Sequence, residues 1–442
     1  MTSFGIEAAG YYVPSLYLEI GALAEARYID PVKLEKGLGL RRMAVADVHE
    51  DAATFAAEAL LRLMEDYAVD PSDIGRVYLG TESALDAAKP TATYAVQMVE
   101  AVLAEKYGER CFKYCDALDM TFACIGAVDA LQNSLDYCRA NPGRKAVVIA
   151  SDYAKYELGS SGEYTQGGGA VALLISDTPK LMAVDSVFGV SMESVFDFFK
   201  PRRLTAKSDW AKASPEMPDR IEVFSDEPVF DGQYSNQCYQ DRIREAYGQY
   251  KQLSGQDCPF ESWRYLIFHL PYAFHGKRVF TEIYAMEKGW PCATPEELKE
   301  VAKSESYRAL VDSKIEPSQR ASSLIGNMYT ASIFMALLSA LQVALDSGEA
   351  LEGQKIGFLA YGSGSKSKVF SGRVGSSWRE VVSKWNLFET LDKRTPIDFV
   401  TYERLHRKQM ETSVNPNYKG FGLDFIEAEN PVLKGARYYV RK

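Results

Sequence analysis

Glu82, Cys124, His269 and Asn327 are four polar residues, far apart in the sequence, whose side chains together suit acyl transfer through a thioester. A Cys thiolate is the nucleophile that takes the acyl group. A Glu or His side chain then removes a proton from the acyl methyl, and the carbanion attacks a second carbonyl. Backbone N–H groups hold the thioester oxygen while charge develops on it. These residue types therefore predict a carbon–carbon condensation on a bound thioester.

Cys124 is the candidate nucleophile, and it stands in the stretch DMTFACIGAVDALQNSLDYC. Apolar residues at helical spacing predict a helix over residues 124–139, which places Cys124 at its start. Unpaired N–H groups and the positive end of the helix dipole lower a thiol pKa at such a position. A free Cys is more often a buried apolar residue, so the stretch alone leaves both interpretations open.

Glu82 and His269 each follow an apolar segment that predicts a strand. Glu82, in GTESALDAAK, either caps the next helix or, buried near a thiol, acts as a general acid or base with a raised pKa. His269, in FHLP, is either a satisfied core residue or a group that holds a carbonyl oxygen. Pro271 would end this strand and leave the imidazole facing a cavity.

The turn YGSGS, residues 361–365, follows another predicted strand. Its glycines would let backbone N–H groups approach an oxyanion, although most such turns are structural. No GK[ST] follows, so the turn is not a phosphate loop. The Gly-rich TQGGGA, residues 165–170, is a weak signal for a nucleotide site.

The composition is that of a globular protein that is not specialised for nucleic acid. The chain has 442 residues and a net charge of −10, which gives no general support for nucleic-acid binding. Its seven cysteines include no CxxC pair, and Cys111 and Cys115 lack the partners of a zinc site. We therefore expect no metal and a reducing, cytoplasmic location. The N-terminus does not resemble a signal peptide, and the longest apolar run, residues 332–345, is too short to span a membrane.

Short apolar strands alternate with helices, which predicts an α/β protein. The predicted strands are residues 76–80, 146–150, 170–175, 265–269 and 356–361. The predicted helices are residues 51–66, 91–107, 124–139, 280–289, 296–312 and 329–347. The polar segment 202–228 is predicted to be a loop or an insertion.

A weak internal repeat links the candidate residues. In each half a strand ends in a polar residue (Glu82 or His269), a helix begins further on (near Cys124 or Asn327), and another strand follows. The repeat lies in the order of elements and not in residue identity. If the two halves pack face to face, these residues and the glycines of YGSGS converge where strands end and helices begin, which is where open α/β sheets place their sites.

Several long motifs occur in an order that resembles the hydroxymethylglutaryl-CoA synthase family of the thiolase superfamily. They are GIEAAGYYVP, LAEARYIDPVKLEKGLGL, GTESALDAAK, TFACIGAVDAL, SDYAKYELGSSGEYTQGGGAVALLI, VFDFFKP, PVFDGQYSNQCY, FHLPY, GNMYTAS, YGSGS, YERLHRKQ and YYVRK. The resemblance covers nearly the whole chain. It implies a thiolase fold, a duplicated five-layered αβαβα sandwich, with one half over residues 1–195 and the other over residues 196–442, the latter with an insertion at 202–228.

The resemblance also implies an activity and the roles of individual residues. The enzyme would condense acetyl-CoA, acetoacetyl-CoA and water, in the mevalonate route to isoprenoids, with no cofactor. Cys124 would be acetylated, Glu82 would be the general acid/base, and His269 would position the acetoacetyl thioester. Asn327 would help to bind the second substrate, Ser363 would form the oxyanion hole with Cys124, and Lys277 and Arg278 would contact CoA. The resemblance also implies that Asp152, Tyr156, Thr165 and Asp197 either contact substrate or support the residues that do. A homodimer is implied, and an acetoacetyl-CoA thiolase is a candidate partner.

Two departures from the family pattern concern substrate binding. The family often has a Lys just after FHxPY, where this chain has Ala273-Phe274-His275, and this bears on how CoA is held. Ile-Gly-Ala follows Cys124 where the family more often has Tyr and small residues, and this bears on the shape of the acyl pocket.

Two other functions remain open from the sequence. One is a relative that installs β-branches in polyketides and takes acyl groups from a carrier protein, with the same chemistry. The motif TESALDAAK favours the mevalonate type. The other is a non-catalytic scaffold on this fold, against which the presence of Glu82, Cys124 and His269 together argues.

Overall fold

The computed structural model describes residues 3–210 and 216–442 of the chain. Within these residues, nine strands form a central sheet in the order β13–β14–β15–β8–β1–β7–β6–β4–β5. Their bounds are β1 Gly5–Tyr12, β4 Ile74–Gly80, β5 Asp116–Met120, β6 Lys145–Ala154, β7 Gly167–Ser176, β8 Met182–Met192, β13 Trp263–Phe268, β14 Lys355–Gly362 and β15 Lys366–Val374.

The sheet consists of two halves with the same strand pairing, which confirms the predicted repeat. In the first half, β1 pairs antiparallel with β7, β7 pairs antiparallel with β6, and β6 pairs parallel with β4. In the second half, β8, β15, β14 and β13 repeat these three relations in the same order. The halves join where β1 meets β8, with Gly5 opposite Ala183. The repeat therefore divides between Ser176 and Met182, whereas the predicted boundary at 195 and 196 falls after β8.

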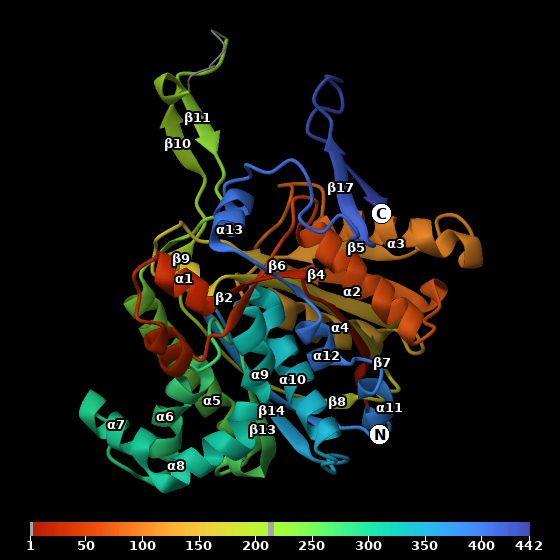
Figure 1. Cartoon of the computed structure of the whole chain (residues 1–442). Coiled ribbons are helices and arrows are strands. Elements are labelled where there is room, and N and C mark those ends of the chain that lie inside the picture. The colour runs from red at the N-terminus through yellow and green to blue at the C-terminus, as the bar shows by residue number, and fades with distance from the viewer. Residues whose placement is uncertain (1–2, 211–215) are drawn as a thin grey trace.

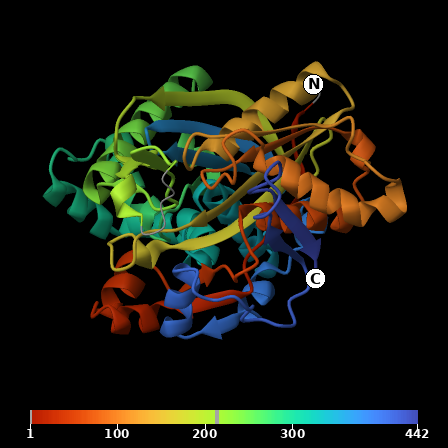
Figure 2. The ribbon, with the colours of Figure 1, turned by 90° about the horizontal axis from the view of Figure 1, so that it is seen from above.

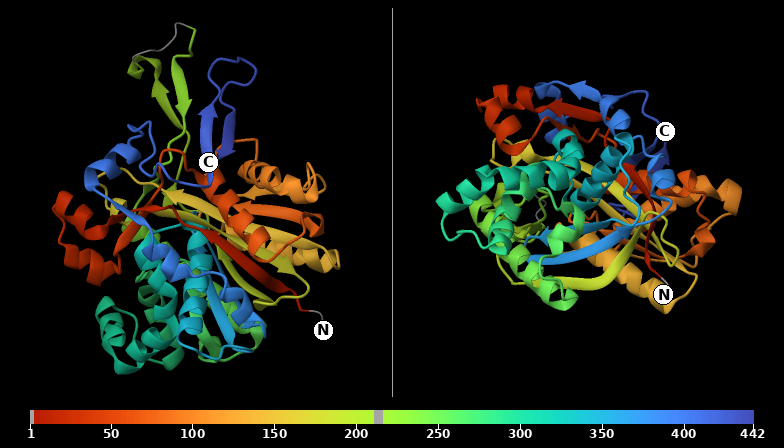
Figure 3. Two further views of the ribbon diagram at one scale, coloured as in Figure 1. Left: turned by 45° about the vertical axis from the view of Figure 1, so that its right-hand side comes forward. Right: turned by 90° about the horizontal axis from the view of Figure 1, so that it is seen from below.

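The helices lie on the faces of the two half-sheets. Their bounds are α1 Ile20–Ala26, α2 Ala52–Asp66, α3 Thr91–Tyr107, α4 Gly126–Ala140, α5 Gly232–Ser254, α6 His275–Lys288, α7 Pro295–Lys303, α8 Glu305–Leu310, α9 Glu316–Ile325, α10 Ser332–Asp346, α11 Trp378–Val382, α12 Leu387–Asp392 and α13 Phe399–His406. The orange helices of the first half lie at one side of the molecule, and the green helices of the second half lie at the other (Figure 3).

Helix α4 forms part of the layer between the half-sheets. Its first turn packs on β4 so closely that a Cβ at Gly80 would lie 2.3 Å from Ala127 N. On its other side, Asp129 accepts from Lys366 at 2.6 Å and lies 2.7 Å from Lys368, both on β15. Helix α2 packs on the opposite face of the first half, where Ser151 donates to Ala52 O at 2.7 Å. Helix α5 packs on the opposite face of the second half, where a Cβ at Gly189 of β8 would lie 2.2 Å from Ala246 O. Helix, sheet, helix, sheet and helix therefore follow one another, as predicted.

The remaining strands form small sheets at the edges of the molecule. They are β2 Leu16–Glu19, β3 Arg42–Val45 and β16 Thr395–Ile397 in one sheet, β9 Phe198–Phe199 with β12 Val229–Phe230, β10 Arg203–Ala206 with β11 Arg220–Val223, and β17 Phe421–Ile426 with β18 Arg437–Arg441. The first of these brings the red N-terminal segment beside the blue C-terminal one (Figure 2). The hairpins β10–β11 and β17–β18 project side by side (Figure 1).

The segment 202–228 is therefore not simply a loop, because it contains the hairpin β10–β11. Residues 211–215 of this segment lie outside the described residues. Several predicted helices shift or divide: 280–289 begins earlier, as α6, and 296–312 is split into α7 and α8.

One helical stretch of the described residues, Tyr329–Asp346, is long and apolar enough to cross a membrane. It includes α10, and 83% of it is buried inside the structure. Leu337, Leu338 and Leu341 of this stretch are fully buried in the main hydrophobic core. The stretch is therefore accounted for as a core helix.

Candidate active site

Cys124 lies in a tight turn between β5 and α4. The preceding residue, Ala123, has φ of +38°, a left-handed conformation that is strained for a residue with a side chain. Ile125 N donates to Phe122 O at 3.1 Å and closes the turn. Helix α4 begins at Gly126, so Cys124 stands next to its first turn, which agrees with the predicted position in or beside that turn. The turn holds the thiol on the inner face of the fold, where it is 7% exposed.

Glu82 is in direct contact with this thiol. Cys124 Sγ donates to Glu82 Oε1 at 3.0 Å. Burial raises the pKa of Glu82 to about 7, against the influence of Lys200, which lowers it. Burial and the neighbouring carboxylate raise the pKa of Cys124 well above its ordinary value, so the predicted lowering is wrong for the resting site. The pair is a protonated thiol beside a carboxylate that titrates near neutral pH.

Asp152 fixes the segment that carries Glu82. Its Oδ1 accepts from Glu82 N at 2.9 Å and from Thr81 Oγ1 at 2.8 Å. Its Oδ2 accepts from Thr330 N at 3.0 Å, just before α10. Asp152 is completely buried and joins the two halves behind the site, which is the supporting position and not the substrate contact that the resemblance allows.

Lys200 is a site residue that the sequence analysis missed. Its Nζ lies 3.8 Å from Glu82 Oε2 and donates to Glu82 O at 3.1 Å. Its side chain is 9% exposed. The available signal was a Lys inside VFDFFKP, one of the motifs that carry the family resemblance.

His269 directly follows β13, as predicted, and is 2% exposed. Tyr239 donates its hydroxyl to His269 O at 2.7 Å and stacks on the imidazole, with ring centroids 6.2 Å apart. Burial lowers the pKa of His269 to about 3. The ring is therefore neutral and can donate one hydrogen bond to a carbonyl oxygen without becoming an imidazolium.

A cavity of about 450 Å³ brings most of the predicted residues together. Those that line it are Cys124, Tyr156, Thr165, His269, Arg278, Asn327 and Ser363. Glu82 and Lys200 line a neighbouring cavity of about 670 Å³, and Phe198 and Ser363 border both. The Glu82 carboxylate therefore contacts the thiol from the neighbouring cavity, while His269 shares a cavity with Cys124.

Asn327 stands between the two halves before α10. Its N donates to Thr165 O at 2.8 Å, and its Oδ1 accepts from Tyr329 N at 2.8 Å. Thr165 in turn donates its hydroxyl to Gly162 O at 2.8 Å. These bonds fix the orientation of the Asn327 amide at the cavity wall. Tyr156 packs against the Tyr329 ring in the same wall.

The YGSGS turn approaches the Cys124 turn through a glycine. A Cβ at Gly362 would lie 2.8 Å from both Ile125 N and Phe122 O, so a side chain there would separate the two turns. Within the described residues, neither Cys124 N nor Ser363 N donates to another backbone group. Two free N–H groups on closely packed turns suit an oxyanion. Asp197, which accepts from Gly364 N at 2.7 Å and from the Tyr361 hydroxyl at 2.7 Å, holds this turn from behind and does not line the cavity.

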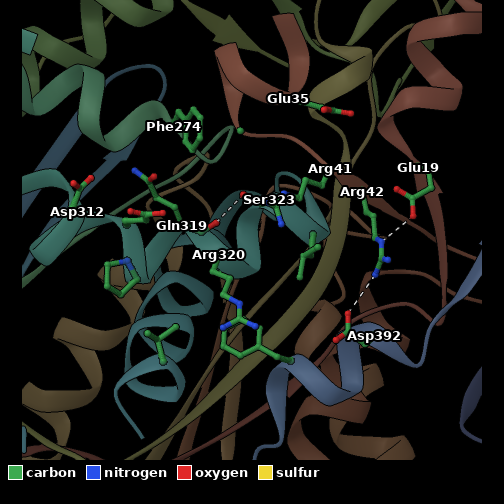
Figure 4. A pocket seen from close by; sticks show the side chains of 16 residues that line it. Glu19, Glu35, Arg41, Arg42, Phe274, Asp312, Gln319, Arg320, Ser323 and Asp392 are labelled. Atoms are coloured by element: carbon green, nitrogen blue, oxygen red, sulfur yellow. Dashed lines mark hydrogen bonds and ion pairs between the residues drawn. The ribbon is translucent and has the colours of Figure 1, made fainter. Parts of the chain in front are cut away.

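Arg278 and Lys277, predicted together as CoA contacts, face different ways. Arg278 lines the cavity mouth and donates to Gly37 O at 2.7 Å. Lys277 Nζ instead lies 3.3 Å from the centre of the Phe274 ring. Phe274 lines a different cavity of about 870 Å³, where Arg42 pairs with Glu19 at 3.0 Å and Asp392 at 3.5 Å (Figure 4).

No cluster of three or more His, Cys, Asp or Glu side chains suited to a metal ion occurs in the described parts of the chain. Cys111 and Cys115, which are four residues apart, are both free thiols.

Comparisons with known proteins agree with this geometry. Residues 2–180 match the family model for the N-terminal part of hydroxymethylglutaryl-coenzyme A synthase, and residues 296–423 match the model for its C-terminal part. The hydroxymethylglutaryl-CoA synthase of Haloferax volcanii is 32% identical over 435 residues, which are 92% of each chain. The enzyme of that name from Enterococcus faecalis is 29% identical and covers 98% of this chain.

Solved structures are similar over the whole chain. MvaS in complex with 3-hydroxy-3-methylglutaryl coenzyme A is 32% identical, with a TM-score of 0.82 and coverage of 100% of this chain and 99% of that one. The HMG synthase of the curacin pathway, solved with an acetyl donor carrier protein, has a TM-score of 0.79 at 23% identity, which shows a shared fold. The predicted thiolase-type fold is confirmed.

Proposed function

The chain belongs to the hydroxymethylglutaryl-CoA synthase family, and from this membership and the site geometry we propose that it condenses acetyl-CoA with acetoacetyl-CoA and water. The products are 3-hydroxy-3-methylglutaryl-CoA and free CoA. The observation that carries the proposal is the 3.0 Å contact of Cys124 Sγ with Glu82 Oε1, across a cavity from His269. Such a site is that of an acyltransferase that condenses thioesters, and not that of a scaffold.

In the first step, Cys124 takes the acetyl group. The sulfur attacks the acetyl-CoA carbonyl, the carbon–sulfur bond to CoA breaks, and the thiol proton leaves with free CoA. The N–H groups of Cys124 and Ser363 donate to the carbonyl oxygen while it is negative. The turn of Cys124 and the close approach at Gly362 place both donors before the substrate arrives.

In the second step, Glu82 removes a proton from the acetyl methyl. The carbanion attacks the ketone carbon of acetoacetyl-CoA, whose oxygen accepts a hydrogen bond from neutral His269. Glu82 then returns its proton to the new alkoxide. A pKa of about 7 suits both transfers, because the carboxyl group gives and takes a proton with little cost near neutral pH.

In the third step, water cleaves the thioester that joins the product to Cys124. The hydroxyl of water goes to the product carboxyl, and its proton restores the thiol. The three steps balance without a metal or a redox cofactor, and we propose none.

The position of the enzyme in the cell and its assembly follow from the same proposal. We place it in the mevalonate route of isoprenoid biosynthesis, in the cytoplasm, since all seven cysteines are free thiols. We propose a homodimer and an acetoacetyl-CoA thiolase that supplies the second substrate. CoA substrates are favoured over carrier-protein substrates because the relative described with 3-hydroxy-3-methylglutaryl coenzyme A is the more similar one, at 32% against 23% identity.

The deciding experiment is intact-mass spectrometry after mixing the protein with acetyl-CoA, followed by peptide mapping. We expect one acetyl group on Cys124, which acetoacetyl-CoA then discharges. Discharge by an acetoacetyl carrier protein and not by acetoacetyl-CoA would move the enzyme to polyketide branching. A protein that gains no acetyl group under either condition would contradict the proposal.

A further inference from the structure

Lys200 places a buried positive charge beside the Glu82 carboxylate. Its Nζ lies 3.8 Å from Oε2, while Oε1 accepts from Cys124 at 3.0 Å. The two carboxylate oxygens are thus divided between an ammonium and a thiol. Nζ also donates to Glu82 O at 3.1 Å, which ties the cation to the same residue by a second contact.

The other ionisable groups that face Glu82 do not supply a positive charge. They are Cys124 in the turn before α4, Asp152 on β6, Tyr156 just after β6, and Tyr329 just before α10. The Asp152 carboxyl group disfavours ionisation of Glu82, as burial does. Lys200 is the larger of the two effects that oppose them, and the hydrogen bond from Cys124 is the smaller.

The surroundings of Lys200 hold the ammonium in place. It follows β9, which pairs with β12 through Phe198 and Phe230. Phe198 packs in one buried cluster with Cys124, Tyr156 and Tyr329. Nζ lies 4.7 Å from the centre of the Tyr329 ring, a favourable position for a cation. The segment between β8 and α5, in the second half, thus delivers a fixed charge to the site.

We propose that Lys200 is a positioning residue that keeps Glu82 ionised and directed at the acetyl group while it serves as the base of the condensation. This inference rests on the proposed function. Lys200 itself neither gives nor takes a proton: the proton moves from the acetyl methyl to Glu82 and on to the alkoxide. The ammonium stabilises the carboxylate before the first transfer and after the second.

The test is the pH profile of condensation by pre-acetylated enzyme in a single turnover. The condensation rate falls at low pH as Glu82 is protonated, and in Lys200→Met we expect this acid limb of the profile to move up by roughly one pH unit. The rate at slightly acid pH should then fall roughly tenfold and recover at alkaline pH. Lys200→Arg keeps the charge and should keep the limb near the wild-type position. Lys145→Met is the matched control, because it removes an ammonium 3.3 Å from Glu7 at the far end of β6.

A second readout does not depend on acyl transfer. Alkylation of Cys124 by iodoacetamide reports the thiolate, which Lys200 also favours, so Lys200→Met should slow it at a fixed pH. Lys200→Gln repeats both measurements if the Met variant does not fold. An acid limb and an alkylation profile that both stay in place would overturn the inference, as would a pH-independent loss that Arg does not rescue. If the wild type fails to condense while the alkylation shift is seen, the proposed function fails and the effect of Lys200 on the site stands.

Discussion

Equivalent strands of the two halves lead to an acidic side chain in the first half and to a basic one in the second. Strand β4 leads to Glu82, whose pKa burial raises to about 7. Strand β13 leads to His269, whose pKa burial lowers to about 3. Burial disfavours the charged form in both cases, yet near neutral pH the carboxyl group titrates and the imidazole does not. The first half can therefore move protons, and the second half can offer a fixed hydrogen bond.

The same division appears at the other equivalent positions. Before α4 the first half places the nucleophile Cys124, and before α10 the second half places the amide of Asn327. Near the end of β6 the first half has the buried carboxyl group of Asp152, and at the end of β14 the second has Gly362, which lets a backbone N–H reach the site. The repeat thus offers the same positions twice, and the two halves fill them with different residues. We call the first half, which carries Cys124 and Glu82, the reactive half, and the second half, which carries His269 and Asn327, the receptive half.

The largest expected effect is that of Cys124→Ala, which removes the nucleophile of the reactive half. Condensation should fall roughly 10⁴-fold or more, because no acyl-enzyme forms. Calorimetric titration with acetoacetyl-CoA should show binding close to that of the wild type, because the receptive half is unchanged. A condensation rate within tenfold of the wild-type rate would contradict the assignment of Cys124 as the nucleophile.

Glu82→Ala should separate the two chemical steps. We expect the condensation step to fall roughly 10²- to 10⁴-fold. Acetylation of Cys124 should persist, since removal of the carboxylate removes one cause of the raised thiol pKa. Intact mass measures acetylation, and single-turnover quench measures condensation. Equal loss of both steps would show that Glu82 has been assigned the wrong role.

His269→Ala should affect the second substrate and leave the first step alone. The lost hydrogen bond is expected to lower kcat/KM for acetoacetyl-CoA roughly ten- to a hundredfold, with an unchanged acetylation rate. His49→Ala is the matched control, because His49 is equally buried but packs on Tyr418. An unaltered KM for acetoacetyl-CoA would count against the receptive role of the second half.

The pH dependence of the condensation rate should report the ionisation of Glu82 in the reactive half and not that of His269 in the receptive half. Glu82 must be ionised to accept a proton, so single-turnover condensation should fall roughly tenfold per pH unit below about 7. His269 stays neutral over this range and adds no limb of its own. Glu82→Gln, assayed across the same range, should lose the limb along with most of the rate. A limb that survives in this variant belongs to another group.

The smallest expected effect concerns the mouth of the cavity. Arg278→Ala should raise KM for CoA substrates by a few fold, as for an exposed ionic contact. Lys277→Ala should change it less, because Lys277 faces Phe274 and a different cavity. KM measured at two salt concentrations tests both. A larger effect at Lys277 would reverse the orientation that the structure gives this pair.

Sequence reasoning found the reactive groups because their chemistry depends on residue type. Cys124, Glu82 and His269 were chosen for what a thiol, a carboxyl and an imidazole do next to predicted strands and helices. The direction of the thiol pKa was wrong because it depends on burial and on a carboxylate that lies far away in the sequence. Lys200 was missed for the same reason, since it lies 118 residues after Glu82 in the sequence.

The fold was predicted where periodicity was strong and missed where polar residues interrupted it. Strands β4, β6, β7, β13 and β14 were found, and α3 was found with its bounds. Helix α5 was missed because it is largely polar and because Tyr supplies much of its buried stripe. Tyr239, Ile243, Ala246 and Tyr250 carry the helical spacing that could have revealed it.

The small sheet β3–β2–β16 has a consequence for how the protein is made. Strand β2 begins at Leu16, and the strand that pairs with its other edge begins at Thr395. The Trp385 indole likewise donates to Ala9 O at 2.9 Å, inside β1. On a ribosome the N-terminal strands therefore emerge long before their last partners are synthesised. Until nearly the whole chain has been translated, the edge of β2 that pairs with β16 stays unpaired, and the position beside β1 that Trp385 occupies stays empty.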